Sequence, residues 1–216
     1  VTIKDSVVLL KMGSNAKPVN TFINYYMWRN RIHFFMKYTP EEKLDHMSYC
    51  ILSSVFDAMY ESMYREEHNI MQTISYAYYD AIRDVRGKAS DGKIRNNDAS
   101  DSRFQSYLQT KKTYYLKADT TEEEQEAQAF IEALQTECQR VEQESDADVT
   151  IVVCPYIMRC KREQYPEKNQ IVLDSYKNVI LDESDWEAVS QYDYAKSLFI
   201  YMNQGAFLEA TKALRK

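Results

Sequence analysis

The chain has 216 residues, of which 44% are hydrophobic and 28% are charged, and its formal net charge is −6 at pH 7. A chain of this size and composition can bury a core of its own. Its apolar stretch at residues 25–38 is interrupted by Arg29, Arg31 and His33, and it is shorter than the roughly 20 apolar residues that span a bilayer. We therefore expect no membrane segment. Because the chain as given shows no secretory signal, we expect an intracellular, cytoplasmic or virion-associated protein.

Helices are predicted for most of the first half of the chain. Only four glycines and four prolines occur, which favours long helices with few breaks. Residues 7–10 are predicted to form a short strand, and residues 21–38 a helix with apolar side chains at helical spacing. Thr39, Pro40 and Glu42 predict a capping box that opens a second helix. A bend at residues 65–69 then separates it from a third helix that ends near Gly87.

The next segment is basic. Residues 83–117 carry nine basic side chains against four acidic ones. Residues 87–102 hold few large apolar side chains, which predicts a mobile loop, and residues 103–117 are expected to form a helix. Cations interleaved with tyrosines are typical of proteins that bind single-stranded nucleic acid. The candidate phosphate contacts are Lys88, Lys93, Arg95, Lys111 and Lys112.

The sign of the charge then reverses. Residues 119–148 carry eleven acidic side chains and a single base, Arg140. Thr121 and Glu124 predict the capping box of an acidic helix, whose buried seam would be Ala127, Ile131, Leu134, Cys138 and Val141. Clustered carboxylates attract cationic surfaces at long range. We therefore predict a protein-interaction site at Glu122, Glu123, Glu124 and Glu126. A solvated helix face, or neutralisation by the basic segment alongside it, are the alternatives.

The last part of the chain is predicted to contain a small sheet. Residues 149–154, 171–173 and 179–181 are β-branched runs, and the last two flank a hairpin turn. Ser184 and Glu187 predict a third capping box, and Gly205 is expected to separate this helix from a final turn or two. The predicted fold is α+β and predominantly helical, with long N-terminal and central helices and a small antiparallel C-terminal sheet. We expect a single domain, residues 1–216, with a helical part at 18–144 and an α+β part at 149–216.

The cysteine and histidine spacings do not define a catalytic or metal site. Cys154 ends a predicted strand near Arg159, which would stabilise a thiolate, but Pro155 and the bulky residues after it leave few backbone N–H groups for a phosphate. His46 and Cys50 share a helix face, yet two ligands do not complete a site. The carboxylates Asp174, Asp182, Glu183 and Asp185 lie near strand ends, where acidic residues also complement a helix dipole. We predict reduced, mostly buried thiols, no metal and no cofactor.

The sequence favours a non-catalytic protein-interaction or assembly protein, in the manner of viral structural or accessory components. It would use aromatic helices and oppositely charged segments to bind a protein partner or a second copy of itself. One alternative is a nucleic-acid-associated protein that binds phosphate through residues 83–117. A second alternative is a thiol-dependent enzyme at Cys154. No small-molecule substrate is identifiable from the residues.

Overall fold

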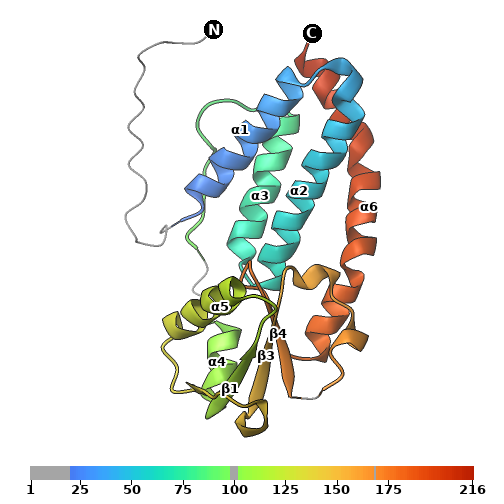
Figure 1. The fold of residues 1–216 in the computed structure, drawn as a ribbon. Coiled ribbons are helices and arrows are strands. Elements are labelled where there is room, and N and C mark those ends of the chain that lie inside the picture. The colour runs from blue at the N-terminus through green and yellow to red at the C-terminus, as the bar shows by residue number, and fades with distance from the viewer. Residues whose placement is uncertain (1–19, 98–101, 168) are drawn as a thin grey trace, which may run out of the picture.

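The computed structural model describes residues 20–97, 102–167 and 169–216. The strand expected at residues 7–10 and part of the loop expected at 87–102 lie outside these ranges. The described elements form two lobes (Figure 1). The helical lobe contains α1 (Phe22–Tyr38), α2 (Leu44–Tyr64), α3 (His68–Ile82) and the C-terminal half of α6 (Glu183–Leu214). The sheet lobe contains the other elements, and α6 runs the length of both lobes.

The helical lobe follows the apolar periodicity of its sequence. The helix expected at residues 21–38 and the bend expected at 65–69 are confirmed, since α1 ends at Tyr38 and α2 and α3 are separated at residues 65–67. Burial of these side chains from water is the main favourable contribution to the fold. The core includes Tyr25, Ile32, Met36, Leu52, Val55, Ile74, Tyr78 and Phe207.

The start of α2 differs from the expected capping box. Pro40 lies in an extended conformation, with φ −54° and ψ 147°, and the chain forms a short 3₁₀ turn, Glu41–Lys43, before α2 begins at Leu44. No side chain caps this turn. The prediction of a capping box at Thr39 is therefore wrong, although the helix that it was meant to open is present.

The sheet has five strands in the order β2-β1-β3-β4-β5. Their bounds are β1 Thr113–Lys117, β2 Gln139–Arg140, β3 Val149–Cys154, β4 Gln170–Asp174 and β5 Val179–Ile180. The pairs β1–β2, β1–β3 and β3–β4 are parallel, and only β4–β5 is antiparallel. The hairpin was predicted correctly, whereas the expectation of an antiparallel sheet is wrong. The parallel pairs need crossover connections, and α5 (Thr121–Ala133) provides one of them.

Residues 103–117 do not form the expected helix. The helix α4 (Arg103–Gln109) ends after seven residues, and β1 follows it. In β1 the side chains of Tyr114 and Leu116 are buried in alternation, which is the period of a strand. The elements α4, β1, α5 and β2 belong to the sheet lobe, although they fall within residues 18–144, the part that was expected to be helical.

The acidic helix α5 is shorter than the predicted seam. It ends at Ala133, and Gln135 lies in the left-handed region with φ 53°, so the chain turns there. Ala127 and Ile131 are buried in the helix as expected. Cys138 is buried just ahead of β2, where it packs against the core between α4, α5 and the sheet. The capping box is formed by Thr120 and Glu123, one residue earlier than predicted.

The last helix also begins and continues differently from the prediction. Its N-cap is Asp182, whose carboxylate accepts hydrogen bonds from the backbone N–H groups of Ser184 (2.9 Å) and Asp185 (3.1 Å). The Ser184–Glu187 capping box is therefore wrong. The helix passes through Gly205 without a break and ends at Leu214.

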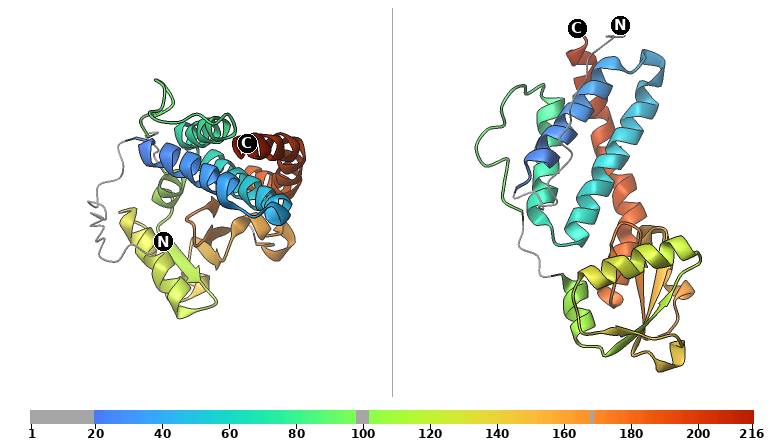
Figure 2. Two further views of the ribbon diagram at one scale, coloured as in Figure 1. Left: turned by 90° about the horizontal axis from the view of Figure 1, so that it is seen from above. Right: turned by 60° about the vertical axis from the view of Figure 1, so that its left-hand side comes forward.

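Helices cover both faces of the sheet (Figure 2). On one face, α4 and α5 pack against Ile151, Ile171 and Leu173. On the other face, Val172 and Ile180 pack against the start of α6 and the end of α2. This second core joins the lobes and is rich in tyrosine, including Tyr60, Tyr156 and Tyr192.

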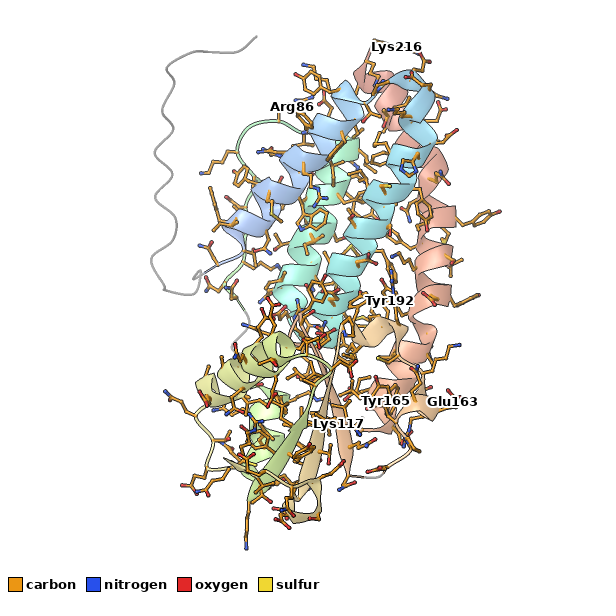
Figure 3. All side chains as sticks on the ribbon, viewed as in Figure 1. Arg86, Lys117, Glu163, Tyr165, Tyr192 and Lys216 are labelled. Atoms are coloured by element: carbon orange, nitrogen blue, oxygen red, sulfur yellow. The ribbon has the colours of Figure 1, made fainter. Side chains whose placement is uncertain are left out.

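Tyrosine hydroxyls carry hydrogen bonds across this junction. Tyr64 donates to the carbonyl of Val179 in β5 (2.8 Å), and Tyr156 donates to Glu61 of α2 (2.9 Å). Tyr192 of α6 donates to Asp57 of α2 (2.5 Å), and its position at the junction is visible in Figure 3. A tyrosine ring buries apolar area while its hydroxyl satisfies a polar partner. The junction thus accounts for part of the unusually high tyrosine content.

Candidate interaction cleft

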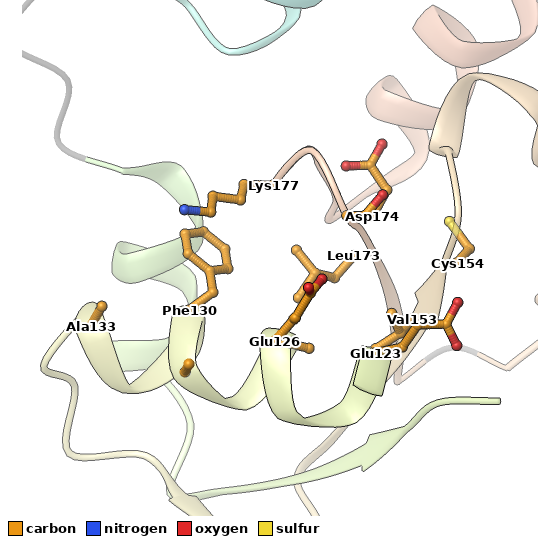
Figure 4. Close-up of a pocket in the computed structure, with 12 residues that line it drawn as sticks. Glu123, Glu126, Phe130, Ala133, Val153, Cys154, Leu173, Asp174 and Lys177 are labelled. Carbon is orange, nitrogen blue, oxygen red and sulfur yellow. The ribbon is translucent and has the colours of Figure 1, made fainter. Parts of the chain in front are cut away.

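A cleft of about 370 Å³ opens between α5 and the carboxyl ends of β3 and β4. In open parallel sheets, ligands bind outside the carboxyl ends of the strands. The cleft is lined by Glu123, Glu126, Ala127, Ala129, Phe130 and Ala133 of α5, by Val153, Cys154, Leu173 and Asp174 of the strands, and by Ser175 and Lys177 of the hairpin turn. Figure 4 shows Glu126, Phe130 and Lys177 around its opening. A cavity of this size suits one large side chain or a small ligand.

The carboxylates predicted as an interaction site do not all face this cleft. Glu123 and Glu126 line it. Glu124 forms an ion pair with Arg140 of β2, on the side of the helix next to the sheet edge. Glu122 is exposed and does not line the cleft. Helix geometry explains the separation, because residues three apart share a face and adjacent residues do not.

Of the two glutamates that line the cleft, Glu126 is the more available to a partner. Glu123 accepts a hydrogen bond from the backbone N–H of Thr120 (3.2 Å) and one from its hydroxyl (3.0 Å), so it is partly committed to the capping box. Glu126 is exposed and has neither a hydrogen bond nor an ion pair within the described part of the chain. Across the opening, the Lys177 ammonium lies 5.3 Å from the centre of the Phe130 ring. The rim therefore carries more negative than positive charge above an apolar floor.

Asp174 shapes the cleft and is not a free ligand. It is buried, with 3% of its surface exposed. One carboxylate oxygen accepts from the backbone N–H groups of Tyr176 and Asn178, both at 2.9 Å. The other accepts from the backbone of Ile157 (3.1 Å) and the side chain of Asn178 (3.0 Å). Four donors saturate a carboxylate, so Asp174 fixes the hairpin turn and the loop after β3.

The remaining carboxylates near the strand ends are also structural. Asp182 caps α6, and Asp185 accepts from the backbone of Leu181 (2.7 Å) and pairs with Arg103 (2.9 Å). Glu183 pairs with Arg162 (2.8 Å). Within the described ranges, no three His, Cys, Asp or Glu side chains are grouped so as to hold a metal ion. His46 and Cys50 do meet on α2, with 3.6 Å between Nε2 and Sγ, without a third ligand.

The environment of Cys154 favours a neutral thiol. Its hydrogen bond to Cys160 and its burial both raise its pKa. Arg159, expected to stabilise a thiolate, is exposed and makes no hydrogen bond with Cys154. The three histidines belong to α1, α2 and α3 in the helical lobe. No histidine therefore lies beside Cys154 to act as its general base.

The basic residues proposed as phosphate contacts are distributed over both lobes. Lys93 is bound to the buried carboxylate of Asp80, at 2.7 Å from each oxygen. Arg95 lies beside α1, since its carbonyl accepts from the N–H of Thr21. Lys88 is exposed in the loop after α3. Lys111 and Lys112 precede β1, at the end of the sheet away from the helical lobe. Lys111 and Lys112 are neighbours in the sequence, whereas Lys93 is held by the buried carboxylate of Asp80.

Exposed apolar side chains gather on two helices. On α1 they are Phe22, Ile23, Met27, Phe34, Phe35 and Tyr38, and on α6 they are Tyr194, Leu198, Tyr201 and Met202. Tyr201 has 84% of its surface exposed. The spacing of the α6 residues places them on one face, which we call the α6 stripe. Contiguous apolar surface of this kind is common where proteins contact one another.

No protein-family model, curated protein or solved structure matches the chain. The geometry described above is therefore the basis for any functional argument. None of the helices in the described ranges combines the length and the apolar character that crossing a bilayer requires.

Proposed function

We propose that the protein is a non-catalytic interaction module that binds a basic segment of a protein partner in the cleft beside α5. The observation that carries this proposal is the position of Glu126, an exposed carboxylate without an internal partner, at the rim of an apolar cleft. An arginine or lysine side chain matches such a site, because its aliphatic stem can cover apolar surface while its charged end reaches a carboxylate.

The shape of the cleft supports a single inserted side chain. Phe130, Val153 and Leu173 provide apolar surface, and Glu123 and Glu126 lie on one side of the opening. Arginine is the better fit of the two cations, since its planar group can contact a carboxylate through two hydrogen bonds. The Lys177 ammonium lies over the Phe130 ring and repels another cation there. The partner's basic group is therefore directed toward the carboxylates of α5.

The α6 stripe supports a second contact in the same assembly. Four large apolar side chains on one helix face are costly to leave in water and are covered when a partner or a second copy binds. The stripe and the cleft belong to different elements, so they can be disrupted independently.

The cleft is tested by titrating the full chain with a short arginine-containing peptide or with the same peptide carrying norleucine in place of arginine. Binding is measured from the NMR chemical shifts of the full chain. We expect the arginine peptide to shift the signals of Glu126, Phe130 and Lys177 and the norleucine peptide to bind at least tenfold more weakly. Glu126→Gln should weaken arginine binding, and increased salt should do the same. Glu122→Gln is the matched control, because Glu122 is exposed on the same helix and does not line the cleft.

Equal binding of the two peptides, or equal affinity in Glu126→Gln and wild type, would contradict the proposed cleft. Charge reversal of all four glutamates is a poorer test, since Glu124 pairs with Arg140 and Glu123 belongs to the capping box. Assembly through the α6 stripe is measured by size-exclusion chromatography with light scattering. A wild-type oligomer that dissociates in Leu198→Ser/Tyr201→Ser supports the stripe, and a wild-type monomer rejects self-assembly.

A further inference from the structure

Two cysteines that the sequence separates by five residues meet at the carboxyl end of β3. The Sγ atoms of Cys154 and Cys160 lie 3.5 Å apart, and both are free thiols. Cys154 is buried and lines the cleft, whereas Cys160 is partly exposed. The hydroxyl of Tyr165 lies 3.5 Å from the Cys160 sulfur. The pair is part of neither the basic segment nor the carboxylate rim.

The loop between the two cysteines is held firmly by the fold. After β3, the short 3₁₀ turn Ile157–Arg159 folds the chain back, and the N–H of Cys160 donates to the carbonyl of Ile157 (2.9 Å). Ile157 and Met158 are buried in the junction core. Asp174 accepts from the backbone of Ile157, and the Ser175 hydroxyl donates to the carbonyl of Pro155 (3.0 Å). These contacts keep the sulfur atoms adjacent.

The environment makes Cys160 the more reactive thiol of the pair. In the structure the Cys160 thiol donates to the Cys154 sulfur, and when Cys160 is ionised the Cys154 thiol can donate in return, which favours the Cys160 thiolate most strongly. Partial burial opposes the charge, and the Tyr165 hydroxyl favours it, so that the pKa of Cys160 is lowered to about 7. The same hydrogen bond and burial raise the pKa of Cys154. The thiolate is the form that attacks an oxidant, so Cys160 is the expected point of attack at neutral pH.

We propose that Cys154 and Cys160 are an oxidisable dithiol that a hydroperoxide converts to an intramolecular disulfide. The Cys160 thiolate attacks one oxygen of hydrogen peroxide, the O–O bond breaks, and hydroxide leaves, which forms a sulfenic acid on Cys160. The Cys154 sulfur then attacks the Cys160 sulfur, the S–O bond breaks, and the hydroxyl leaves as water with the proton of the Cys154 thiol. In total the thiols lose two electrons and the peroxide is reduced to water.

Disulfide formation requires the two sulfur atoms to come closer together than they are in the structure. A disulfide bond needs the sulfurs at about 2.05 Å, so they must approach by about 1.5 Å. Reduction by a small dithiol returns the pair to the structure described here. The inference does not depend on the partner proposed for the cleft, because its chemistry involves the two thiols and the oxidant alone.

The test uses the full chain with Cys50→Ser, which removes the exposed thiol and with it disulfide-linked dimers through that residue. After treatment with hydrogen peroxide, we expect two of the three remaining thiols to become unreactive toward a thiol reagent in denaturant. The intact mass should fall by two hydrogen atoms, and peptide mapping should link residues 154 and 160. Reduction should restore both thiols.

Further variants assign the two roles. In Cys154→Ser the sulfenic acid cannot be resolved, so dimedone should label Cys160 after peroxide treatment. In Cys160→Ser the oxidation of Cys154 should be at least tenfold slower at pH 7. Cys138→Ser is the control, because Cys138 is buried in a different core and should not affect the linkage. The proposal would be overturned if all three thiols stayed reactive after peroxide treatment, or if the disulfide included Cys138. Either outcome is independent of peptide binding.

Discussion

The two lobes use their acidic side chains in different ways. In the helical lobe the buried carboxylate is that of Asp80, and its partners are side chains: the Tyr25 hydroxyl and the Lys93 ammonium. In the sheet lobe, three aspartates instead accept hydrogen bonds mainly from backbone N–H groups. Asp148 accepts from Lys112 and Thr113, Asp174 accepts from three backbone groups, and Asp182 caps α6.

This difference shows why net charge alone is a poor guide to an interaction surface. The sheet lobe looks strongly acidic in sequence, but its aspartates hold loops and helix ends in place. Backbone hydrogen bonds explain the lowered pKa of Asp148, as they satisfy its charged form. Within α5, the acidic side chains that have no internal contact are Glu122 and Glu126.

The largest expected effect tests whether the two lobes unfold together or separately. Leu52 of α2 is fully buried in the helical core. Leu52→Ala should lower the free energy of unfolding by about 3 kcal/mol through lost apolar burial and the cavity left behind. Because the tyrosine-rich core joins the lobes, amide signals from both should disappear in one transition during a denaturant titration. Two separate transitions would show that each lobe folds independently.

The side-chain cluster at Asp80 should be the most sensitive polar position in the helical lobe. Asp80→Ala leaves the buried Tyr25 hydroxyl and the Lys93 ammonium without their acceptor, and we expect a loss of about 3 kcal/mol in chemical denaturation. Burial and Asp80 together raise the pKa of Tyr25 to about 12, and without Asp80 this pKa should fall. Asp91→Ala, at an exposed carboxylate of the following loop, is the control and should change stability very little. Equal losses would contradict the role of Asp80.

The hydroxyl of Tyr192 tests the bonds between the lobes. It donates to Asp57 and lies within hydrogen-bond distance of Tyr156 (3.3 Å) and Lys196 (3.2 Å). Tyr192→Phe should cost about 1 kcal/mol, since the ring still fills the core while Asp57 loses one donor. Tyr194→Phe on the same helix is the control, as Tyr194 is 75% exposed. The measurement is the midpoint of thermal unfolding. If the two variants had the same midpoint, the junction would depend on packing alone.

The elements that the sequence predicted well are those whose burial repeats at a regular spacing. The helices α1, α2 and α3 have long apolar patterns, and periodicity identifies them. The strand β3 was identified instead by its run of β-branched residues. β1 was mistaken for a helix because five residues, TYYLK, contain too few positions to distinguish the two periods. The parallel order of the strands depends on crossover connections, which no local pattern specifies.

The candidate cleft was predicted only in part. The acidic segment was identified, and the exposed position of Glu126 follows from the helix that contains it. The apolar walls come from β3 and β4, far along the chain, so only the fold brings them to α5. The dithiol could not be predicted from the spacing of the two cysteines, because only the turn after β3 returns Cys160 to Cys154.

Substitutions at the start of α6 are expected to change stability the least. They distinguish the predicted capping residue from the observed one. The sequence predicted Ser184 as the capping residue, whereas Asp182 accepts the backbone bonds. Asp182→Ala should therefore cost about 1 kcal/mol, Asp182→Asn clearly less, and Ser184→Ala the least. Hydrogen bonds from Ser184 lower the pKa of Asp182, against a smaller effect of burial.

A carboxylate with a lowered pKa stabilises the fold above its unfolded pKa, and this contribution is lost as the pH falls through the folded value. The difference between wild type and Asp182→Asn, measured by denaturant unfolding, should thus be full at pH 7 and shrink below about pH 4. Two results would contradict these expectations: a difference that is unchanged at low pH, or a larger loss in Ser184→Ala than in Asp182→Ala. The first result would remove the charge of Asp182 from the stability of the sheet lobe, and the second would remove its role as the cap.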